Sequence, residues 1–336
     1  MLLAGSGPSL RAGRPLSDYE FSLRFPAANS RFASYADVAA LGGAQAGSEW
    51  ASSVNPASAA WPHPSRKYLY SFAPQFATVL FSAGTRLDVF FEALTLDAGA
   101  WGTFLPSAAQ VRSNRSTNRQ GSGFELEADY FQLQWGKLVT KHWAVGAMFG
   151  LSRADTRFRV DGREVGRSRG ETYTYRAGVV HQAWETLRVG AVLEYASSPS
   201  RNRALAFDPA TSTLTPVGSS DTTQELLLRT GLTWRCAKGC DLYVDYHGGV
   251  FKNDAGKLWV HRFPIGLEQT VVADILFARL GTTLDTRGNV AVTAGVGLSL
   301  GARASLDLAY QRDNFPEVRH EFGVSDSFVM SLGVGF

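Results

Sequence analysis

The strongest constraint on this chain is a two-residue hydrophobic period in its C-terminal half. Apolar side chains stand at every second position from 290 to 300, and the positions between them carry small or polar ones. The runs 304–311 and 327–336 repeat the pattern. Because successive side chains of a strand point to opposite faces, this period predicts β-strands that are apolar on one face. A soluble β-sandwich would show the same alternation, so the period alone does not choose between the two classes.

Composition favours a membrane barrel over a soluble sandwich. Only 19% of the 336 residues are charged, 12% are aromatic and 34 are glycine, while the mean hydropathy is near neutral at -0.09. No stretch holds 18 consecutive apolar residues, which excludes a helical membrane protein. A hydrophobic content of 45% excludes disorder, and a net charge of +3 excludes a nucleic-acid partner. The sequence therefore predicts an all-β fold, a transmembrane antiparallel β-barrel of the outer membrane.

About fourteen strands are expected, an even number as in closed bacterial barrels. The three C-terminal runs are preceded by nine similar ones and by two shorter ones. The nine lie near 86–97, 124–137, 142–158, 170–184, 186–196, 222–235, 240–250, 257–268 and 272–284. The two shorter runs lie near 67–73 and 76–82, with a connection at Pro74 between them. The barrel is expected to span residues 66–336.

The predicted connections alternate in length, as periplasmic turns and extracellular loops do. Short ones fall near 83–85, 138–141, 184–186, 236–239, 269–271 and 300–302, and longer ones near 98–123, 159–169, 198–221 and 313–324. Four tryptophans stand beside short turns, namely Trp135, Trp143, Trp184 and Trp234. Because the indole ring prefers the headgroup region, this placement predicts an aromatic girdle at one membrane surface.

The end of the chain resembles the C-terminal signal of outer-membrane barrel proteins, which the barrel assembly machinery reads. Its alternating residues are Phe328, Met330, Leu332, Val334 and the terminal Phe336. This resemblance implies the outer membrane of a Gram-negative bacterium, with lipids and lipopolysaccharide as surroundings. Residues 1–7 are too short for a secretory signal peptide, so we expect a mature or truncated chain that lacks its signal.

Residues 1–65 lack strand alternation and are rich in Ala, Ser and Gly, with a short helix expected from Tyr35 to Leu41. Two stretches follow, Leu-Gly-Gly-Ala at 41–44 and Asn-Pro-Ala at 55–57. Together they resemble the N-terminal segment of the long-chain fatty acid outer membrane transporter family. In that family the segment is a hatch that plugs the barrel. The resemblance implies a hatch at 1–65 held by Gly42, Gly43, Asn55, Pro56 and Ala57. A periplasmic tail without a gating role is the alternative.

The same resemblance implies passive uptake of hydrophobic small molecules such as long-chain fatty acids. Such channels capture a ligand at the outer face, pass it to a pocket near the hatch and release it sideways into the membrane. The first extracellular connection, near Pro74, is almost absent here, which is more similar to the compact branch that includes the type IX secretion barrel subunit. The alternative function is therefore a non-transporting barrel that binds or shuttles other proteins.

Two further features suggest local chemistry. Cys236 and Cys240 straddle a short turn, where a small disulfide, free thiols or a metal site would fit, in that order of preference. Three long connections are basic, with Arg112, Arg115 and Arg119, then Arg163, Arg167 and Arg169, then Arg201 and Arg203. Arginine suits bidentate contact with phosphate, so these loops are expected to face lipopolysaccharide phosphates or simply water.

An enzyme is not expected. The six histidines are dispersed, and no nucleophile-elbow, zinc-protease or phosphate-loop pattern is present, so no cofactor and no metal are predicted. Asp241, Asp245 and His247 share one strand face at a two-residue spacing. This row is either a polar site in the lumen or a wet lumen wall. Lumen-facing positions alone do not identify pocket residues.

Overall fold

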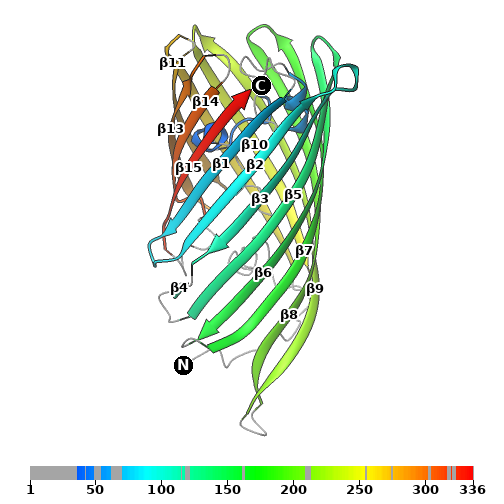
Figure 1. Ribbon diagram of the computed structural model, residues 1–336, viewed down its shortest axis with the longest axis vertical. Coiled ribbons are helices and arrows are strands. Elements are labelled where there is room, and N and C mark those ends of the chain that lie inside the picture. The colour runs from blue at the N-terminus through cyan, green and yellow to red at the C-terminus, as the bar shows by residue number, and fades with distance from the viewer. Residues whose placement is uncertain are drawn as a thin grey trace.

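The computed structural model is a closed antiparallel β-barrel that surrounds part of its own N-terminal segment (Figure 1). The structure describes residues 36–41, 43–48, 54–61, 70–114, 116–117, 122–160, 163–208, 213–253, 256–273, 275–301, 304–315, 319 and 323–335. Each strand pairs with its sequence neighbour, and the ladders β1–β15 and β3–β5 close the ring. Among the described residues, no helix is long and apolar enough to cross a bilayer.

Fourteen strands form the ring, and the two-residue β4 (Ser116–Thr117) pairs beside it. The ring strands are β1 (Tyr70–Phe81), β2 (Arg86–Asp97), β3 (Thr103–Ser113), β5 (Ser122–Thr140), β6 (Trp143–Val160), β7 (Arg163–Trp184), β8 (Leu187–Asp208), β9 (Thr213–Ala237), β10 (Cys240–Asn253), β11 (Gly256–Val272), β12 (Leu276–Asp285), β13 (Val290–Ser299), β14 (Ala304–Arg312) and β15 (Ser325–Gly335). The short helical elements are α2 (Ala36–Ala40), η2 (Pro56–Ala60) and η3 (Gly99–Trp101).

The predicted number of strands is confirmed, but two of the assignments behind it are wrong and cancel. The runs 67–73 and 76–82 are one strand, because Pro74 pairs with Glu92 on β2 and interrupts only the β15 ladder. Proline removes one ladder donor without ending the strand. Conversely, the predicted connection 98–123 contains β3, whose centre, Ser107 to Ala109, carries side chains too small to show the alternation.

The two ends of the barrel differ in strand length (Figure 1). At the short-turn rim, tight turns at 141–142, 185–186 and 238–239 join the strands, and the C-terminus lies there too. At the opposite end, the extended rim, β7, β8 and β9 reach 22, 22 and 25 residues, whereas β12 to β15 have 9 to 11. The predicted loops 159–169 and 198–221 are therefore mostly strand, and turn 82–85 belongs to the extended rim.

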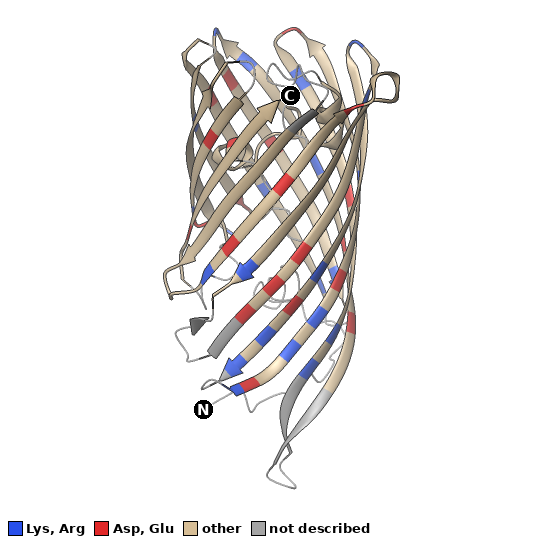
Figure 2. Ribbon diagram, in the orientation of Figure 1, with Lys and Arg blue, Asp and Glu red and all other residues tan. Residues whose placement is uncertain are grey.

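The outer face of the barrel is apolar. Large hydrophobic side chains are exposed at alternate positions of the strands, among them Phe131, Leu193, Leu228 and Phe328. Three of the four tryptophans of the predicted girdle, Trp143, Trp184 and Trp234, are exposed at the short-turn rim, whereas the exposed Trp259 lies near the extended rim on β11. The position of the three at a membrane surface stays a prediction. Trp101 joins them, because its turn lies at this rim and its carbonyl accepts a hydrogen bond from the indole of Trp135 at 2.8 Å. Charged residues concentrate toward the extended rim (Figure 2).

A charge placed in the middle of this apolar face should destabilise the barrel. Leu228 of β9 is exposed on the outer face and lies six residues from Trp234, so we expect it to face the bilayer interior. We expect Leu228→Lys to lower the free energy of unfolding by about 2–4 kcal/mol in lipid bilayers. Thr222→Lys is the control, because Thr222 is exposed on the same strand toward the extended rim. Urea unfolding followed by tryptophan fluorescence measures both, and equal losses would contradict a bilayer-facing Leu228.

Candidate functional site

The N-terminal segment enters the barrel lumen and contacts opposite walls. Its described parts, 36–41, 43–48 and 54–61, are called the inner segment below. Helix α2 lies against β13, β14 and β15, while η2 lies against β5, β6 and β7. Of the predicted hatch residues, Gly43, Asn55, Pro56 and Ala57 lie in the inner segment, whereas Gly42 is outside the described residues. The short helix predicted at 35–41 is confirmed as α2.

Asn55 is the hydrogen-bond centre of the inner segment. Its side chain is fully buried, and its amide donates to the carbonyls of Ala46 at 2.8 Å and Val179 of β7 at 3.0 Å. Its carboxamide oxygen accepts the Ala57 N–H at 3.0 Å and so caps η2. The backbone of Asn55 is extended, as the following proline requires. One side chain therefore joins both halves of the inner segment to the barrel wall.

Glycines of the wall form the seat on which the inner segment rests. Six of them point at it, one on each of six strands: Gly136, Gly146, Gly178, Gly190, Gly266 and Gly295. A Cβ at Gly136 would lie 2.8 Å from the Pro56 carbonyl oxygen, and one at Gly146 would overlap the Ala57 nitrogen. Any larger side chain would displace the inner segment, so backbone-to-backbone packing requires glycine at these positions.

Polar wall residues hold α2 on the opposite side. The Ala36 N–H donates to Ser331 of β15 at 2.8 Å. The hydroxyl of Thr293 donates to the Ala40 carbonyl at 2.7 Å, and the amide of Gln311 donates to the Ala39 carbonyl at 2.9 Å. These bonds satisfy backbone groups that both ends of so short a helix leave open.

One side of the lumen wall carries buried ion pairs. Glu194 of β8, 1% exposed, accepts from Arg176 of β7 at 2.6 Å and from Arg229 of β9 at 3.2 Å. On β10, Asp245 accepts the Ala46 N–H of the inner segment at 2.7 Å and lies 3.3 Å from His247. The predicted polar row on β10 therefore faces the lumen, with Asp245 bound to the inner segment.

A second set of buried ion pairs lies further round the barrel. Arg279 of β12 contacts Glu268 of β11 at 2.5 Å and also pairs with Asp307 of β14. Buried charges of this kind need their partners, because an unpaired charge in a low-dielectric interior is strongly unfavourable. Both sets of pairs occupy the strands from β7 to β14.

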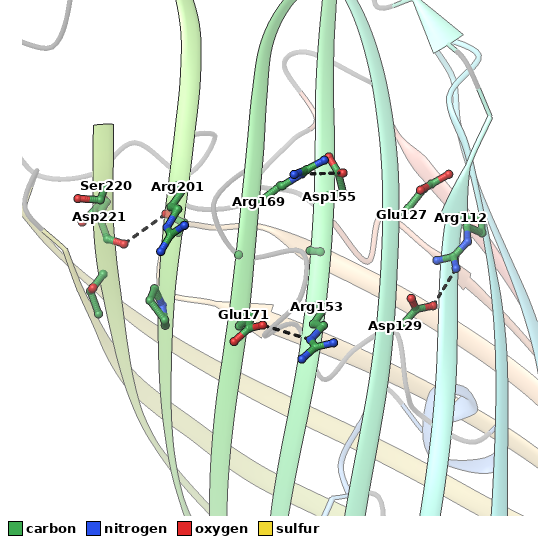
Figure 3. A pocket seen from close by; sticks show the side chains of 15 residues that line it. Arg112, Glu127, Asp129, Arg153, Asp155, Arg169, Glu171, Arg201, Ser220 and Asp221 are labelled. Atoms are coloured by element: carbon green, nitrogen blue, oxygen red, sulfur yellow. Dashed lines mark hydrogen bonds and ion pairs between the residues drawn. The ribbon is translucent and has the colours of Figure 1, made fainter. Parts of the chain in front are cut away.

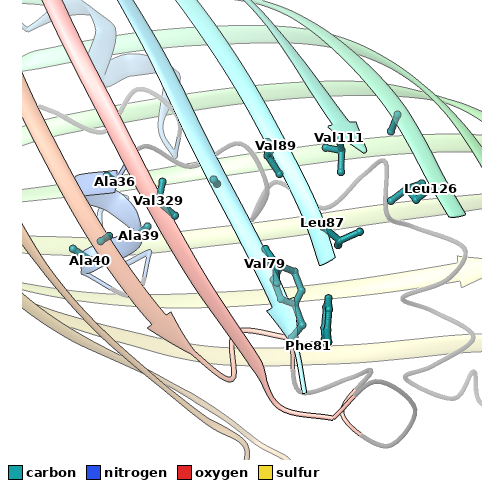
Figure 4. Packing of buried hydrophobic residues seen from close by; sticks show 14 residues of the cluster. Ala36, Ala39, Ala40, Val79, Phe81, Leu87, Val89, Val111, Leu126 and Val329 are labelled. Atoms are coloured by element: carbon teal, nitrogen blue, oxygen red, sulfur yellow. The ribbon is translucent and has the colours of Figure 1, made fainter. Parts of the chain in front are cut away.

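The other side of the lumen wall is apolar. A cluster of buried hydrophobic side chains covers the inner faces of β1, β2, β3, β5, β14 and β15 and meets α2 (Figure 4). Its members are Ala36, Ala39, Ala40, Ala77, Val79, Phe81, Leu87, Val89, Val111, Leu126, Ala128, Ala309, Phe315 and Val329. Phe81 and Phe315 contact each other near the extended rim, with tilted rings whose centroids are 6.1 Å apart. This apolar wall therefore runs from the extended rim to the inner segment.

The predicted lipopolysaccharide-facing arginines lie on strands and not in loops. Strand β3 contains Arg112, strand β7 contains Arg163, Arg167 and Arg169, and strand β8 contains Arg201 and Arg203. These strands continue toward the extended rim beyond the part of the outer face that is apolar. Arg115 and Arg119 fall outside the described residues. Arg112 pairs with Asp129 at 2.8 Å, and Arg169 with Asp155 at 3.2 Å. Contact with lipopolysaccharide phosphates stays a prediction.

These arginines share an outward-facing depression of about 630 Å³ near the extended rim (Figure 3). Arg112, Arg153, Arg169 and Arg201 line it together with five carboxylates, those of Glu127, Asp129, Asp155, Glu171 and Asp221. Arg153 pairs with Glu171 at 3.2 Å, although 71% of its side chain is exposed. Exposed pairs such as this one contribute little to stability, so the row is available to bind other charged groups.

The C-terminal residues alternate as predicted. Phe328, Met330 and Leu332 are exposed on the outer face of β15, Val334 is half-buried, and Phe336 is outside the described residues. Their reading by the assembly machinery stays a prediction.

The two cysteines face each other across the β9–β10 turn. Both are free thiols in the structure, and their sulfur atoms are 3.1 Å apart, longer than the roughly 2.05 Å of a disulfide bond. The two sulfur atoms are therefore within reach of each other, and the disulfide stays a prediction.

Sequence reasoning missed the lumen site itself. The wall glycines are spread over strands far apart in the chain, so no local pattern marks them as a seat. Likewise the apolar wall is made of residues such as Val89, Val111 and Val329, which look like any other strand positions. The available signal was the high glycine content together with inward positions that hold valine where serine or glycine was expected.

Comparison with known proteins places the fold. No protein-family model matches the sequence, and no curated protein matches it. Among solved structures, the toluene transporter TbuX of Ralstonia pickettii superposes with a TM-score of 0.61 at 14% identity, over 90% of this chain and 98% of its own. The monoaromatic hydrocarbon channel CymD superposes with a TM-score of 0.61 at 12% identity, over 90% of this chain and 97% of its own. A FadL homologue of Pseudomonas aeruginosa superposes with a TM-score of 0.60 at 12% identity, over 90% of this chain and 98% of its own. The fold implied by the sequence resemblance is therefore confirmed.

Enlarging a seat glycine should release the inner segment. We expect Gly146→Val to overlap Ala57 and lower the free energy of unfolding by about 1–3 kcal/mol. An Ala57→Cys reporter, with the native cysteines changed to serine, should then react faster with a maleimide. Gly150→Val is the control, because a Cβ there meets its nearest atoms at an ordinary 3.5 Å on the same strand. Equal labelling of the two variants would contradict the seat.

Oxidation should join the cysteines without moving the strands, because the sulfur atoms already touch. We expect oxidised protein to lose two hydrogen atoms in its intact mass and to resist alkylation. Alkylation of both Cys236 and Cys240 after oxidation would show that the thiols stay free.

Proposed function

We propose that this chain is a passive channel for hydrophobic small molecules in the outer membrane of a Gram-negative bacterium. The observation that carries the proposal is the apolar wall, which lines one side of the lumen from the extended rim to α2. A water-filled pore for polar solutes has a polar interior, whereas this wall offers continuous apolar contact to a molecule that leaves water. The extended rim faces outward and the short-turn rim faces the periplasm.

The inner segment acts as the hatch of this channel. Its support is the close contact with the glycine seat and the hydrogen bonds of Asn55, which join the inner segment to β7 of the wall. A ligand that follows the apolar wall meets α2, where Ala36, Ala39 and Ala40 belong to the same cluster. Movement of the hatch, or an exit through the wall beside it, would then complete the passage.

Two kinds of ligand are candidates. Long-chain fatty acids are the ligands that the sequence resemblance implies. Monoaromatic hydrocarbons such as toluene are the ligands of the similar transporter TbuX and channel CymD. Both would gain the same apolar contact, so the proposal at this level concerns hydrophobic small molecules as a class.

A charge on the apolar wall should block the passage. Val111 of β3 is 1% exposed on the lumen side, whereas the adjacent Gln110 is exposed on the outer face. In a Gram-negative host that expresses the chain, we expect Val111→Asp to slow uptake of the fluorescent hydrophobic probe N-phenyl-1-naphthylamine on the order of tenfold. Gln110→Asp should leave uptake unchanged, and a heat-dependent shift in gel mobility would show that both variants fold.

Two results would count against the proposal. Uptake that does not exceed that of cells without the protein would exclude the channel. Recovery of a stoichiometric protein partner with no lipid, after gentle purification, would favour the alternative of a protein-binding barrel in a secretion complex.

A further inference from the structure

We propose that the channel selects uncharged hydrophobic ligands and excludes ionised amphiphiles such as fatty acid carboxylates. This inference rests on the proposed function and assigns the ligand class. The selecting residues are those of the apolar wall, chiefly Val79, Leu87, Val89, Val111 and Leu126.

The first observation is the absence of charge from this wall. Five strands that follow one another round the barrel, β15, β1, β2, β3 and β5, carry many fully buried side chains. Every one of these that the structure describes is uncharged. The polar ones among them are hydroxyls and amides, such as Ser327 and Gln75. Among the described buried side chains of these five strands, a ligand therefore meets no cation that could accompany a carboxylate.

The second observation is the pairing of the arginines across the lumen. Arg176 and Arg229 share Glu194, and Arg279 is held between Glu268 and Asp307. A carboxylate ligand would have to displace a buried carboxylate of the protein, which would itself be left without its partner. These three arginines are thus neutralised by carboxylates of the protein itself.

Arg319 at the extended rim is also paired with a carboxylate of the protein. Asp313 is 6% exposed there, two residues from Phe315 of the apolar wall. Its carboxylate pairs with Arg319, whose side chain is 54% exposed, at 3.3 Å. An ionised ligand that enters past the pair of Phe81 and Phe315 would lose its water beside the apolar wall, which is unfavourable without a counter-charge.

Selectivity can be measured with two ligands of one chain length. Radiolabelled 1-dodecanol and dodecanoate differ in the ionised head, and both are offered at neutral pH to a Gram-negative host that lacks its own fatty acid channel. We expect the protein to accelerate dodecanol uptake at least about tenfold more than dodecanoate uptake, because only the second leaves an unpaired charge on the wall.

The outcomes separate the two proposals. If neither ligand enters faster than in cells without the protein, the proposed function fails. If both are accelerated equally, or dodecanoate is preferred, the channel stands and the selectivity is overturned.

A cation introduced on the wall should change the preference. We expect Val89→Arg to raise dodecanoate uptake relative to dodecanol by about tenfold, since it supplies the missing counter-charge. Ser327→Lys is the second variant, because Ser327 faces the same lumen side and is already polar, so it is more easily accommodated if Val89→Arg does not fold. The control is Phe90→Arg on the outer face of the same strand, with unchanged preference expected. An unchanged preference in both lumen variants would overturn the assignment.

Discussion

Closure of the backbone hydrogen-bond ladder is the constraint on which this structure depends. In hydrocarbon an unpaired backbone donor or acceptor costs several kcal/mol, so a spanning sheet is stable only without edges. Here the ladders β1–β15 and β3–β5 provide that closure, and Pro74 gives up one bond without opening the ring. Once closed, the barrel has an inside and an outside, and each strand position belongs to one of them.

The lumen wall has a charged side and an apolar side, whereas the wall of a simple polar pore is polar all round. Ion pairs occupy the strands from β7 to β14, where Asp245 also receives the backbone of the inner segment. Apolar side chains occupy the strands on the other side and meet α2. The inner segment therefore lies between a charged wall that holds it and an apolar wall that a hydrophobic molecule can follow. This division connects the anchoring of the hatch with the class of ligand.

The fold was predictable to a large extent. Alternation over 290–300 and 327–336 predicts strands with one apolar face, and the tryptophans beside short turns predict their orientation. Two errors arose where the local signal was weak, at Pro74 within β1 and at the small residues at the centre of β3. The lengths of β7 to β9 were also missed, because arginine-rich ends were taken as loops although they continue as paired strands beyond the apolar band.

The sequence by itself determined the class of fold and the presence of a non-strand segment before the strands, because these follow from periods and motifs that are local in the chain. Only the tertiary structure decided which residues meet in the lumen. The glycine seat joins positions from Gly136 to Gly295, and the apolar wall joins Val79 to Val329, so both depend on the closing register and not on spacing. A two-residue period tells which side chains share a face, but only closure brings the faces of distant strands together.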